Sequence, residues 1–267
     1  MRRGTATSPI RAYRAGGFSD TDDVLAVEEP LELRIGHDSS GEASTLSVMM
    51  RTPGHDRELV AGWLWAEGLL EAVDGLETDP DTPNVVILRG DSERLRGAAR
   101  ATLTSAACGV CGSGSVERLS IRAAPALWTA GALDPELILT LPEQLGRAQP
   151  GFAATGGLHA AGLFTPDGGL LCAFEDVGRH NAVDKVVGWA ARRSELPLTD
   201  RVLVTSSRAG FEIVQKAALA GVAVTVTVGA ASSLAADTAG ALGLTLVGFV
   251  RAGRFNVHAG AQRVGRG

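Results

Sequence analysis

The sequence contains few cysteines and very few lysines. Three cysteines among 267 residues are too few, and odd in number, for a secreted domain held together by disulfides, so a reducing cytoplasm is expected. Of the 25 basic residues only Lys185 and Lys216 are lysines, and both fall in polar motifs where a compact ammonium group suits better than a planar guanidinium. The net charge of −5 gives no electrostatic reason to expect a nucleic-acid partner.

The sequence also lacks a hydrophobic run typical of a signal peptide or a membrane span. Residues 1–18 are basic and polar, which predicts a flexible basic tail. The uncharged stretch 217–236 is interrupted by Gly221 and Gly229 and alternates β-branched residues, which favours a buried strand. No membrane partner is therefore expected.

What is present predicts an α/β fold in two parts. Residues 19–125 mix short strands with a helix N-capped by Asp56, and they predict a smaller α+β domain that ends in a cysteine-containing loop. A proline-containing connector, residues 122–144, follows. Residues 126–267 then contain a hairpin pattern, a helix beginning near Asn181, and alternating strands and helices. This order predicts a layered, largely parallel sheet with right-handed crossovers.

Cys108 and Cys111 form a CxxC motif in a run rich in glycine and serine. A zinc site needs about four ligands, but there is no second CxxC and no H-x-E motif of the zinc deaminases. A thioredoxin-like site would place the motif at the start of a helix, and no amphipathic pattern follows it. A glycine-rich loop suits a thiol that carries sulfur as a persulfide, with a structural loop or a metal site as the alternatives.

Polar residues follow the predicted strands at their carboxyl ends, where open α/β sheets bind ligands. Ser206, Ser207 and Arg208 can donate hydrogen bonds at a helix N-terminus, as phosphate sites do. Arg251 and Arg254 follow the last strand and can hold phosphates or a guanine edge, with an ordinary basic surface as the alternative.

A third polar group surrounds a strand-to-helix turn at "EDVGRHNAVDK" and contains His180 and Lys185. Adjacent residues diverge on a helix, so at most one of Asp184 and Lys185 is expected to follow His180 inward. A capped helix start with solvated charges is the alternative for each residue. For Lys216, a surface pair with Glu212 four residues earlier is the simplest explanation.

Seven motifs together resemble the formate dehydrogenase accessory sulfurtransferases, the FdhD family. They run in order from residue 27 to residue 257: "EEPLELRI", "RTPGHDRELVAGWLWAEGLL", "CGVCG", "GGLHAAGLF", "EDVGRHNAVDK", "SSRAGFEIVQKAALAGV" and "GFVRAGRFNV". The sequence departs from the family pattern at Ala107, where serine is expected, and this removes a possible hydroxyl donor to Cys108.

The resemblance implies a cytidine deaminase-like layered sheet with helices, plus a smaller N-terminal α+β domain. It also implies a sulfurtransferase that takes sulfur from a cysteine desulfurase of the IscS type. The acceptor would be the molybdenum or tungsten of a bis(molybdopterin guanine dinucleotide) cofactor that formate dehydrogenase requires. The aligned persulfide cysteine is Cys108, and Cys111 is the assisting thiol. Family members form homodimers. The aligned cofactor-binding segment consists of Phe249, Val250, Arg251, Ala252, Gly253 and Arg254.

Two hypotheses follow for the function. In the first, Cys108 accepts sulfur and delivers it to the metal, Cys111 assists, no metal is bound permanently, and the strand-end residues hold the cofactor's anionic parts. In this hypothesis the segment 249–254 is joined by Ser206, Ser207, Arg208, His180 and Lys185. In the second, the protein is a non-catalytic cofactor-binding chaperone whose CxxC is a structural or metal site.

Overall fold

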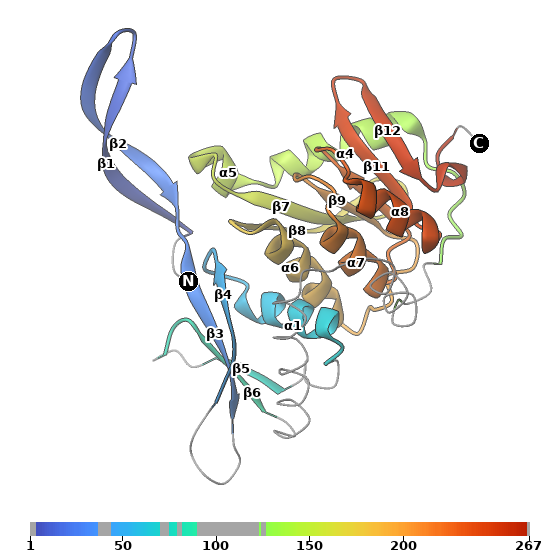
Figure 1. Ribbon diagram of the computed structural model, residues 1–267, viewed down its shortest axis with the longest axis horizontal. Coiled ribbons are helices and arrows are strands. Elements are labelled where there is room, and N and C mark those ends of the chain that lie inside the picture. Colours follow the sequence, from blue (N-terminus) through green and yellow to red (C-terminus); the bar gives the residue numbers. More distant parts are fainter. Residues whose placement is uncertain are drawn as a thin grey trace.

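The computed structural model describes residues 4–36, 44–69, 75–78, 82–89, 123 and 127–265. The largest of the three sheets in these residues has six strands in the order β12-β11-β10-β9-β7-β8 (Figure 1). Their bounds are β7 (His159–Phe164), β8 (Leu170–Asp176), β9 (Val202–Thr205), β10 (Val224–Thr227), β11 (Thr245–Arg251) and β12 (Arg254–Ala259). The three strands β9, β10 and β11 are parallel to one another, whereas β7, β8 and β12 pair antiparallel. The predicted alternation is confirmed, but the sheet is mixed.

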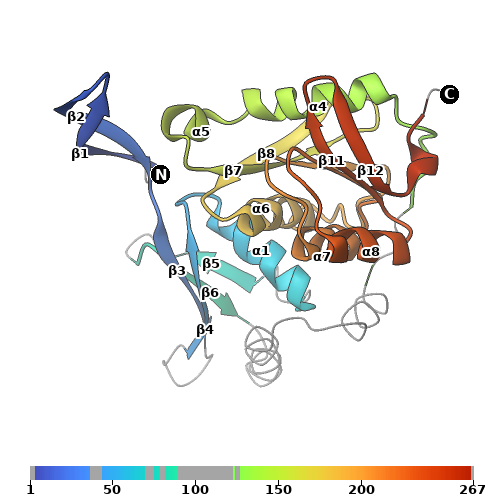
Figure 2. The same ribbon diagram turned by 45° about the horizontal axis from the view of Figure 1, so that its top comes forward.

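Helices cover both faces of this sheet (Figure 2). One face packs against α4 (Pro135–Arg147), and the other against α6 (Arg179–Ala191), α7 (Phe211–Leu219) and α8 (Ser233–Ala241). Alternation along β9 explains the arrangement, because Val202 and Val204 join the α4 side while Leu203 joins the α6 and α7 side. Two short helices, α5 (Pro150–Thr155) and η2 (Ala261–Arg263), complete the unit.

Helix α4 lies in the segment predicted as a connector. Its N-cap Asp134 accepts a hydrogen bond from the backbone N–H of Glu136 at 3.0 Å, and Pro135 occupies the first turn. The buried side chains Ile138, Leu141 and Leu145 follow helical spacing. Of the prolines that suggested a connector, Pro135 therefore marks a helix start and Pro142 lies inside the helix, while Pro125 lies outside the described residues.

The smaller unit is a four-stranded sheet in the order β4-β3-β6-β5, with one helix packed on it. Its elements are β3 (Glu29–Gly36), β4 (Ser44–Arg51), α1 (Asp56–Glu67), β5 (Leu76–Thr78) and β6 (Val85–Arg89). The N-cap of α1 is His55, at φ 57°, and not Asp56 as predicted. The Asp56 carboxylate instead accepts a hydrogen bond from Arg51 Nε at 2.8 Å, which withdraws it from the capping position.

The two units meet where α1 crosses α6. A Cβ placed on Gly62 would lie 1.9 Å from the carbonyl oxygen of Asp184, and one on Gly188 would lie 1.8 Å from that of Glu58. Both glycines are therefore required for the helices to approach so closely. Trp65 Nε1 adds a hydrogen bond to the carbonyl of Leu219 in α7 at 2.9 Å.

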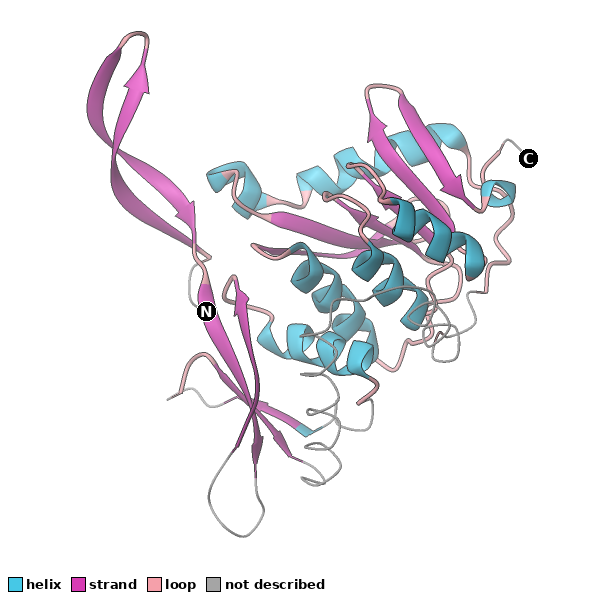
Figure 3. Cartoon of the chain, in the orientation of Figure 1, coloured by secondary structure: helices cyan, strands magenta, loops and turns pink. Residues whose placement is uncertain are grey.

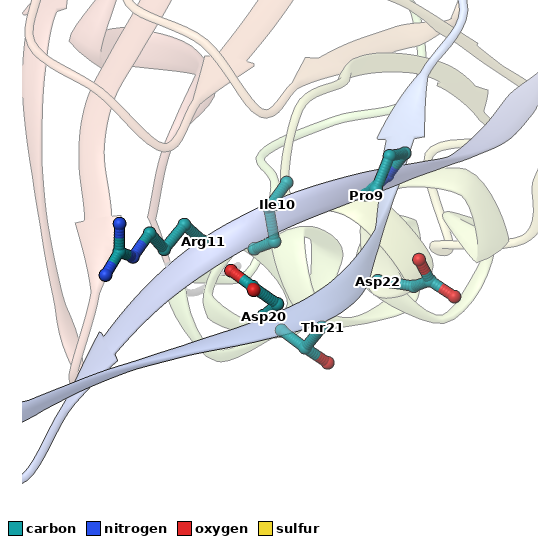
Figure 4. A pocket seen from close by; sticks show the side chains of 6 residues that line it. All are labelled: Pro9, Ile10, Arg11, Asp20, Thr21 and Asp22. Carbon is teal, nitrogen blue, oxygen red and sulfur yellow. The ribbon is translucent and has the colours of Figure 1, made fainter.

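The N-terminal residues form the third sheet, a hairpin of β1 (Thr5–Arg14) and β2 (Gly17–Ala26) that projects away from the other two sheets (Figure 3). The prediction of a flexible tail over residues 1–18 is therefore wrong, and its boundary falls inside β2. Positive φ angles at Ala15 and Gly16 make the tight turn that the sequence-based reading missed. Figure 4 shows a hollow on the hairpin where Arg11 lies across from Asp20. The predicted boundary between residues 125 and 126 lies outside the described residues.

The predicted class is confirmed: the protein has a mixed α/β architecture, with a layered larger unit and a smaller α+β unit. Among the described residues, no helix combines the length and apolarity needed to cross a membrane.

Candidate functional site

Five strand ends meet at one edge of the larger sheet, which we call the carboxyl edge. The parallel strands β9, β10 and β11 end there, and β7 begins there because it runs antiparallel to β9. Strand β8 also ends there, since Asp176 pairs with His159. The loops after these strands carry most of the predicted cofactor-binding residues, so the topology brings together segments far apart in the sequence.

The segment Ser206–Arg208 follows β9 directly. Ser206 Oγ accepts a hydrogen bond from the backbone N–H of Ala160 at 2.9 Å, and the buried Ser207 hydroxyl donates to the carbonyl of Arg208 at 3.1 Å. Both hydroxyls therefore stabilise the loop, and α7 begins only at Phe211. The side chain of Arg208 is exposed and forms no ion pair with any described residue. Of the three predicted residues, Arg208 is the one free to bind an anion.

The turn between β11 and β12 presents two arginines side by side. Ala252 and Gly253 both have positive φ, 49° and 74°, as a two-residue hairpin turn requires, and Arg251 pairs across it with Arg254. Both side chains are exposed. Like charges directly opposite in a sheet are destabilising, so this pair favours an anionic ligand.

Residues before the turn fix its geometry. Phe249 has φ 57° at an irregularity of the β11–β12 pairing, and its ring lies 5.0 Å from the Arg251 guanidinium. Val250, 2% exposed, anchors the strand in the core. The predicted segment 249–254 is thus one bent ribbon whose buried valine and stacked phenylalanine position the two arginines.

His180 lies at the start of α6, and its Nε2 is 2.6 Å from Glu212 Oε2 on α7. The hydrogen bond from His180 lowers the pKa of the Glu212 carboxyl. Nearby, burial lowers the pKa of His159, and electrostatic interactions with Arg179 and His180 lower it further. Basic side chains thus gather at this end of the carboxyl edge, and Glu212 and His159 are neighbours of His180 that the sequence-based site did not include.

Lys185 is placed differently from the other predicted residues. It is 1% exposed, and its Nζ lies 2.7 Å from Asp176 Oδ2, whose side chain is fully buried. The same ammonium donates to the carbonyls of Thr52 at 3.2 Å and Glu175 at 3.0 Å. With its donors directed inward, Lys185 supports the walls of the site rather than presenting a charge to a ligand.

Asp176 is the centre of a network that joins the two units, which we call the inter-unit clamp. Its Oδ1 accepts hydrogen bonds from Gly178 N at 2.8 Å and Asn181 Nδ2 at 2.9 Å, and its Oδ2 accepts one from Thr52 N at 3.3 Å. Asn181 Nδ2 also donates to the carbonyl of Met50 at 2.8 Å. Most of the "EDVGRHNAVDK" motif therefore holds the β4–α1 turn against β8 and α6.

A second ion pair lies on the far side of α6. Asp184 Oδ1 is 2.7 Å from Lys216 Nζ, both side chains are largely buried, and burial raises the pKa of the Asp184 carboxyl. The expectation that only one of Asp184 and Lys185 points inward is wrong, because α6 is enclosed by the sheet, α1 and α7. The predicted surface pair of Glu212 with Lys216 is also wrong, since each residue has a partner on α6.

Cys108 and Cys111 lie outside the described residues. The third cysteine, Cys172 in β8, packs against the core beneath α6, and burial raises the pKa of its thiol to about 12. It is therefore a thiol and not a thiolate at neutral pH, as expected for a small hydrophobic residue. Thr52 is the clamp residue that sequence reasoning missed; the "RTPG" turn before α1 was the available signal.

Comparison with known proteins agrees with this architecture. The profile of the FdhD/NarQ family matches residues 26–265, and the chain belongs to that family. A "Sulfur carrier protein FdhD" from Corynebacterium efficiens is 46% identical over 257 residues, covering 89% of this chain and 90% of that protein. The protein of the same name from Nocardia farcinica is 43% identical, covering 98% and 95%.

A solved structure shares the fold. The crystal structure described as a formate dehydrogenase accessory protein from Desulfotalea psychrophila has a TM-score of 0.75 and 23% identity, and the match covers 98% of this chain and 100% of that one. The match extends over nearly the whole of both chains, so the shared fold includes both units and the projecting hairpin.

Proposed function

We propose that the protein is a sulfur carrier that serves formate dehydrogenase. It takes sulfane sulfur from a cysteine desulfurase onto Cys108 and delivers it to the molybdenum or tungsten of a bis(molybdopterin guanine dinucleotide) cofactor. The relatives named as sulfur carriers support the first half of this statement. The carboxyl edge supports the second half, since its exposed arginines form no ion pair with any described residue.

The loading step needs only a thiolate and a persulfide. The Cys108 thiolate attacks the outer sulfur of the desulfurase persulfide, a new S–S bond forms, and the desulfurase cysteine leaves as a thiolate. Cys111, three positions later, can then assist release of the sulfur to its acceptor. This makes the protein a sulfurtransferase in the sense that a covalent intermediate forms on its own chain.

The cofactor is the substrate of the second step, and its phosphates fit the carboxyl edge. Arg208, Arg251 and Arg254 offer planar guanidinium groups that bind phosphate oxygens in pairs. The observation that carries the proposal is the Arg251–Arg254 pair, since two opposed cations on one turn are stabilised when an anion lies between them. His180 borders the same edge. Ser206, Ser207 and Lys185 support the loops and walls of this edge through their hydrogen bonds.

A persulfide assay tests the proposal. The full-length protein is mixed with a desulfurase and cysteine, and mass spectrometry is expected to find one extra sulfur atom on the peptide that contains Cys108. Cys108→Ala is expected to lose the adduct and the activation of formate dehydrogenase, while Cys172→Ala is the matched control that keeps both. Absence of the adduct from the wild type, or full activation by Cys108→Ala, would refute the sulfur-carrier role.

The same variants separate this function from the chaperone alternative. A protein that only shelters and inserts the cofactor would still mature formate dehydrogenase after substitution of both Cys108 and Cys111 by alanine. Stoichiometric zinc that is lost on thiol alkylation would indicate a structural metal site instead.

We also propose that the protein acts as a cytoplasmic homodimer. The hairpin supports this, because an isolated two-stranded sheet is marginal in water and this one exposes Tyr13 (64%) and Phe18 (66%) near its tip. A second copy that covers these rings would stabilise it. Light scattering is expected to give a dimer for the wild type and a monomer for a Tyr13→Ser, Phe18→Ser variant; a monomeric wild type would refute the proposal.

A further inference from the structure

A second hollow, of about 610 Å³, lies at the start of α1, away from the carboxyl edge. It is bounded by the first turn of α1, by the segment that leads into β6 and by Arg192 at the end of α6. None of its lining residues belongs to the carboxyl edge. A volume of this size is typical of a site for a small molecule.

Two of the three arginines around this hollow are already paired. Arg51, 1% exposed, holds Asp56 through Nε at 2.8 Å and Nη2 at 3.2 Å. Arg192 forms an ion pair with Glu58 on the facing helix. These contacts fix the walls and neutralise both carboxylates.

Arg57 is the exception. It lines the hollow, forms no ion pair with any described residue, and its Nε is buried without a hydrogen-bond partner. Buried donors of a native protein are nearly always satisfied by protein, water or a ligand. The Nε itself is enclosed, so an acceptor that enters the hollow would meet the Nη donors at the end of this guanidinium.

The charged side chains around the hollow indicate what kind of ligand group would accept hydrogen bonds from Arg57. Arg51 is held by Asp56 and lies 3.9 Å from Glu29, and Arg192 is held by Glu58. Arg57 is the guanidinium of the hollow that these carboxylates do not pair, and one such group is matched by one anionic group of a ligand. The planar fork of an arginine matches a carboxylate in the bidentate arrangement.

His55 supplies a neutral wall of the same hollow. It adopts a left-handed conformation, φ 57°, which is strained for a residue other than glycine, and its ring packs edge-on against Phe174 with centroids 4.8 Å apart. Burial lowers the pKa of the imidazole, which is therefore neutral at pH 7 and can donate one hydrogen bond without adding charge.

We propose that this hollow binds a small molecule bearing a single carboxylate, with Arg57 as its ion-pair partner and His55 as a neutral donor beside it. The inference is independent of the sulfur-carrier proposal, since it uses neither the cysteines nor the carboxyl edge. It assigns a second binding site to the start of α1, with Arg192 of α6 on one side.

Calorimetric titration of the full-length protein with acetate, benzoate, N-acetylglycine and inorganic phosphate tests the proposal. At least one monocarboxylate is expected to bind at one site per chain, and phosphate more weakly or not at all. Arg57→Gln is expected to weaken that binding about ten-fold or more, because hydrogen bonds to charged groups contribute roughly 1.5–3 kcal/mol. The matched control Arg147→Gln removes an exposed arginine on α4 and is expected to leave it unchanged.

Two further measurements guard against a misfolded variant. His55→Asn keeps a residue that tolerates the left-handed conformation and is expected to weaken binding less than Arg57→Gln. In the wild type, the NMR signal of the Arg57 Nε–H is expected to shift on addition of the carboxylate. Failure of every monocarboxylate to bind, a preference for phosphate, or equal binding by Arg57→Gln would each overturn the proposal.

Discussion

The inter-unit clamp and the carboxyl edge are both rich in charged residues, yet they use charge in opposite ways. In the clamp, Asp176 and Lys185 are fully buried, and each polar atom has several partners. At the carboxyl edge, Arg251 and Arg254 are exposed, lie opposite one another and have no carboxylate partner among the described residues. A cluster of charged residues in a sequence motif therefore does not by itself identify a binding site. Charges with buried partners stabilise the fold, whereas exposed charges of the same sign that lie side by side favour a bound ion of opposite charge.

The largest effect is expected at the clamp. Lys185→Met removes the buried ammonium and leaves the Asp176 carboxylate uncompensated, which typically costs about 3–5 kcal/mol. Urea denaturation followed by circular dichroism measures the loss. A stability unchanged within experimental error would mean that the clamp does not hold the units together, and the contrast with the carboxyl edge would fail.

The contact between α1 and α6 gives the next effect. Gly62→Ala would place a methyl group against the carbonyl of Asp184, and overpacking of this kind costs about 1–3 kcal/mol. The matched control is Gly240→Ala in α8, where an added Cβ meets no atom within 4 Å. That substitution is expected to be neutral or to raise the stability by about 0.5–1 kcal/mol. Equal thermal unfolding of both variants would contradict the close α1–α6 contact.

At the carboxyl edge, Arg254→Gln is expected to act on binding and not on stability. Loss of one guanidinium removes charge-assisted hydrogen bonds worth roughly 1.5–3 kcal/mol, so cofactor retention falls about ten-fold or more. Pterin fluorescence of the purified protein measures the retention, and the denaturation midpoint is expected to stay level or rise. Arg147→Gln serves as the control, and a loss of stability without a loss of cofactor would reverse the comparison.

The smallest effect is expected where the two regions adjoin, at the His180–Glu212 pair. The lowered pKa of Glu212 means that the unfolded chain binds more protons, so the pair stabilises the protein above the usual carboxyl pKa of about 4.3 and loses this contribution as the pH falls through the lowered value. Glu212→Gln is expected to cost less than about 1 kcal/mol at pH 7, because the pair is partly exposed to solvent, which weakens it. It should also flatten the acid side of the stability profile, and an unchanged profile would contradict the assignment.

Much of the larger unit could be predicted from sequence, because its elements carry strong local signals. The hairpin over β7 and β8, the helices α6 and α7 and the strands β10 and β11 follow from periodicity and from turn residues such as "PDGG". The same reasoning gave the carboxyl edge, since parallel strands deliver their ends together. It placed Arg251 and Arg254 there without any knowledge of the turn between them.

The errors came from contacts between distant residues. Aspartate is a residue type that commonly caps helices, but the carboxylate of Asp56 accepts a hydrogen bond from Arg51 instead. Lys185 reads as a ligand-binding residue until Asp176 and Thr52 are brought beside it. The N-terminal hairpin was missed because its exposed strands lack the alternation of apolar residues that marks a half-buried sheet. For Asp56 and Lys185, the side-chain partners brought close by the fold decided the role, and the local sequence did not show these partners.

The close crossing of α1 and α6 has a consequence for how the chain matures. Thr52 meets Asp176 across 124 positions of sequence, so the smaller unit leaves the ribosome long before its docking surface exists. Until α6 is synthesised, the face of α1 that contains Gly62 and the neighbouring tryptophans has no partner within the chain. Such surfaces can make non-native contacts with other chains. A nascent chain stalled before residue 179 is thus the form most exposed to aggregation, and completion of α6 is the step that ends this vulnerable interval.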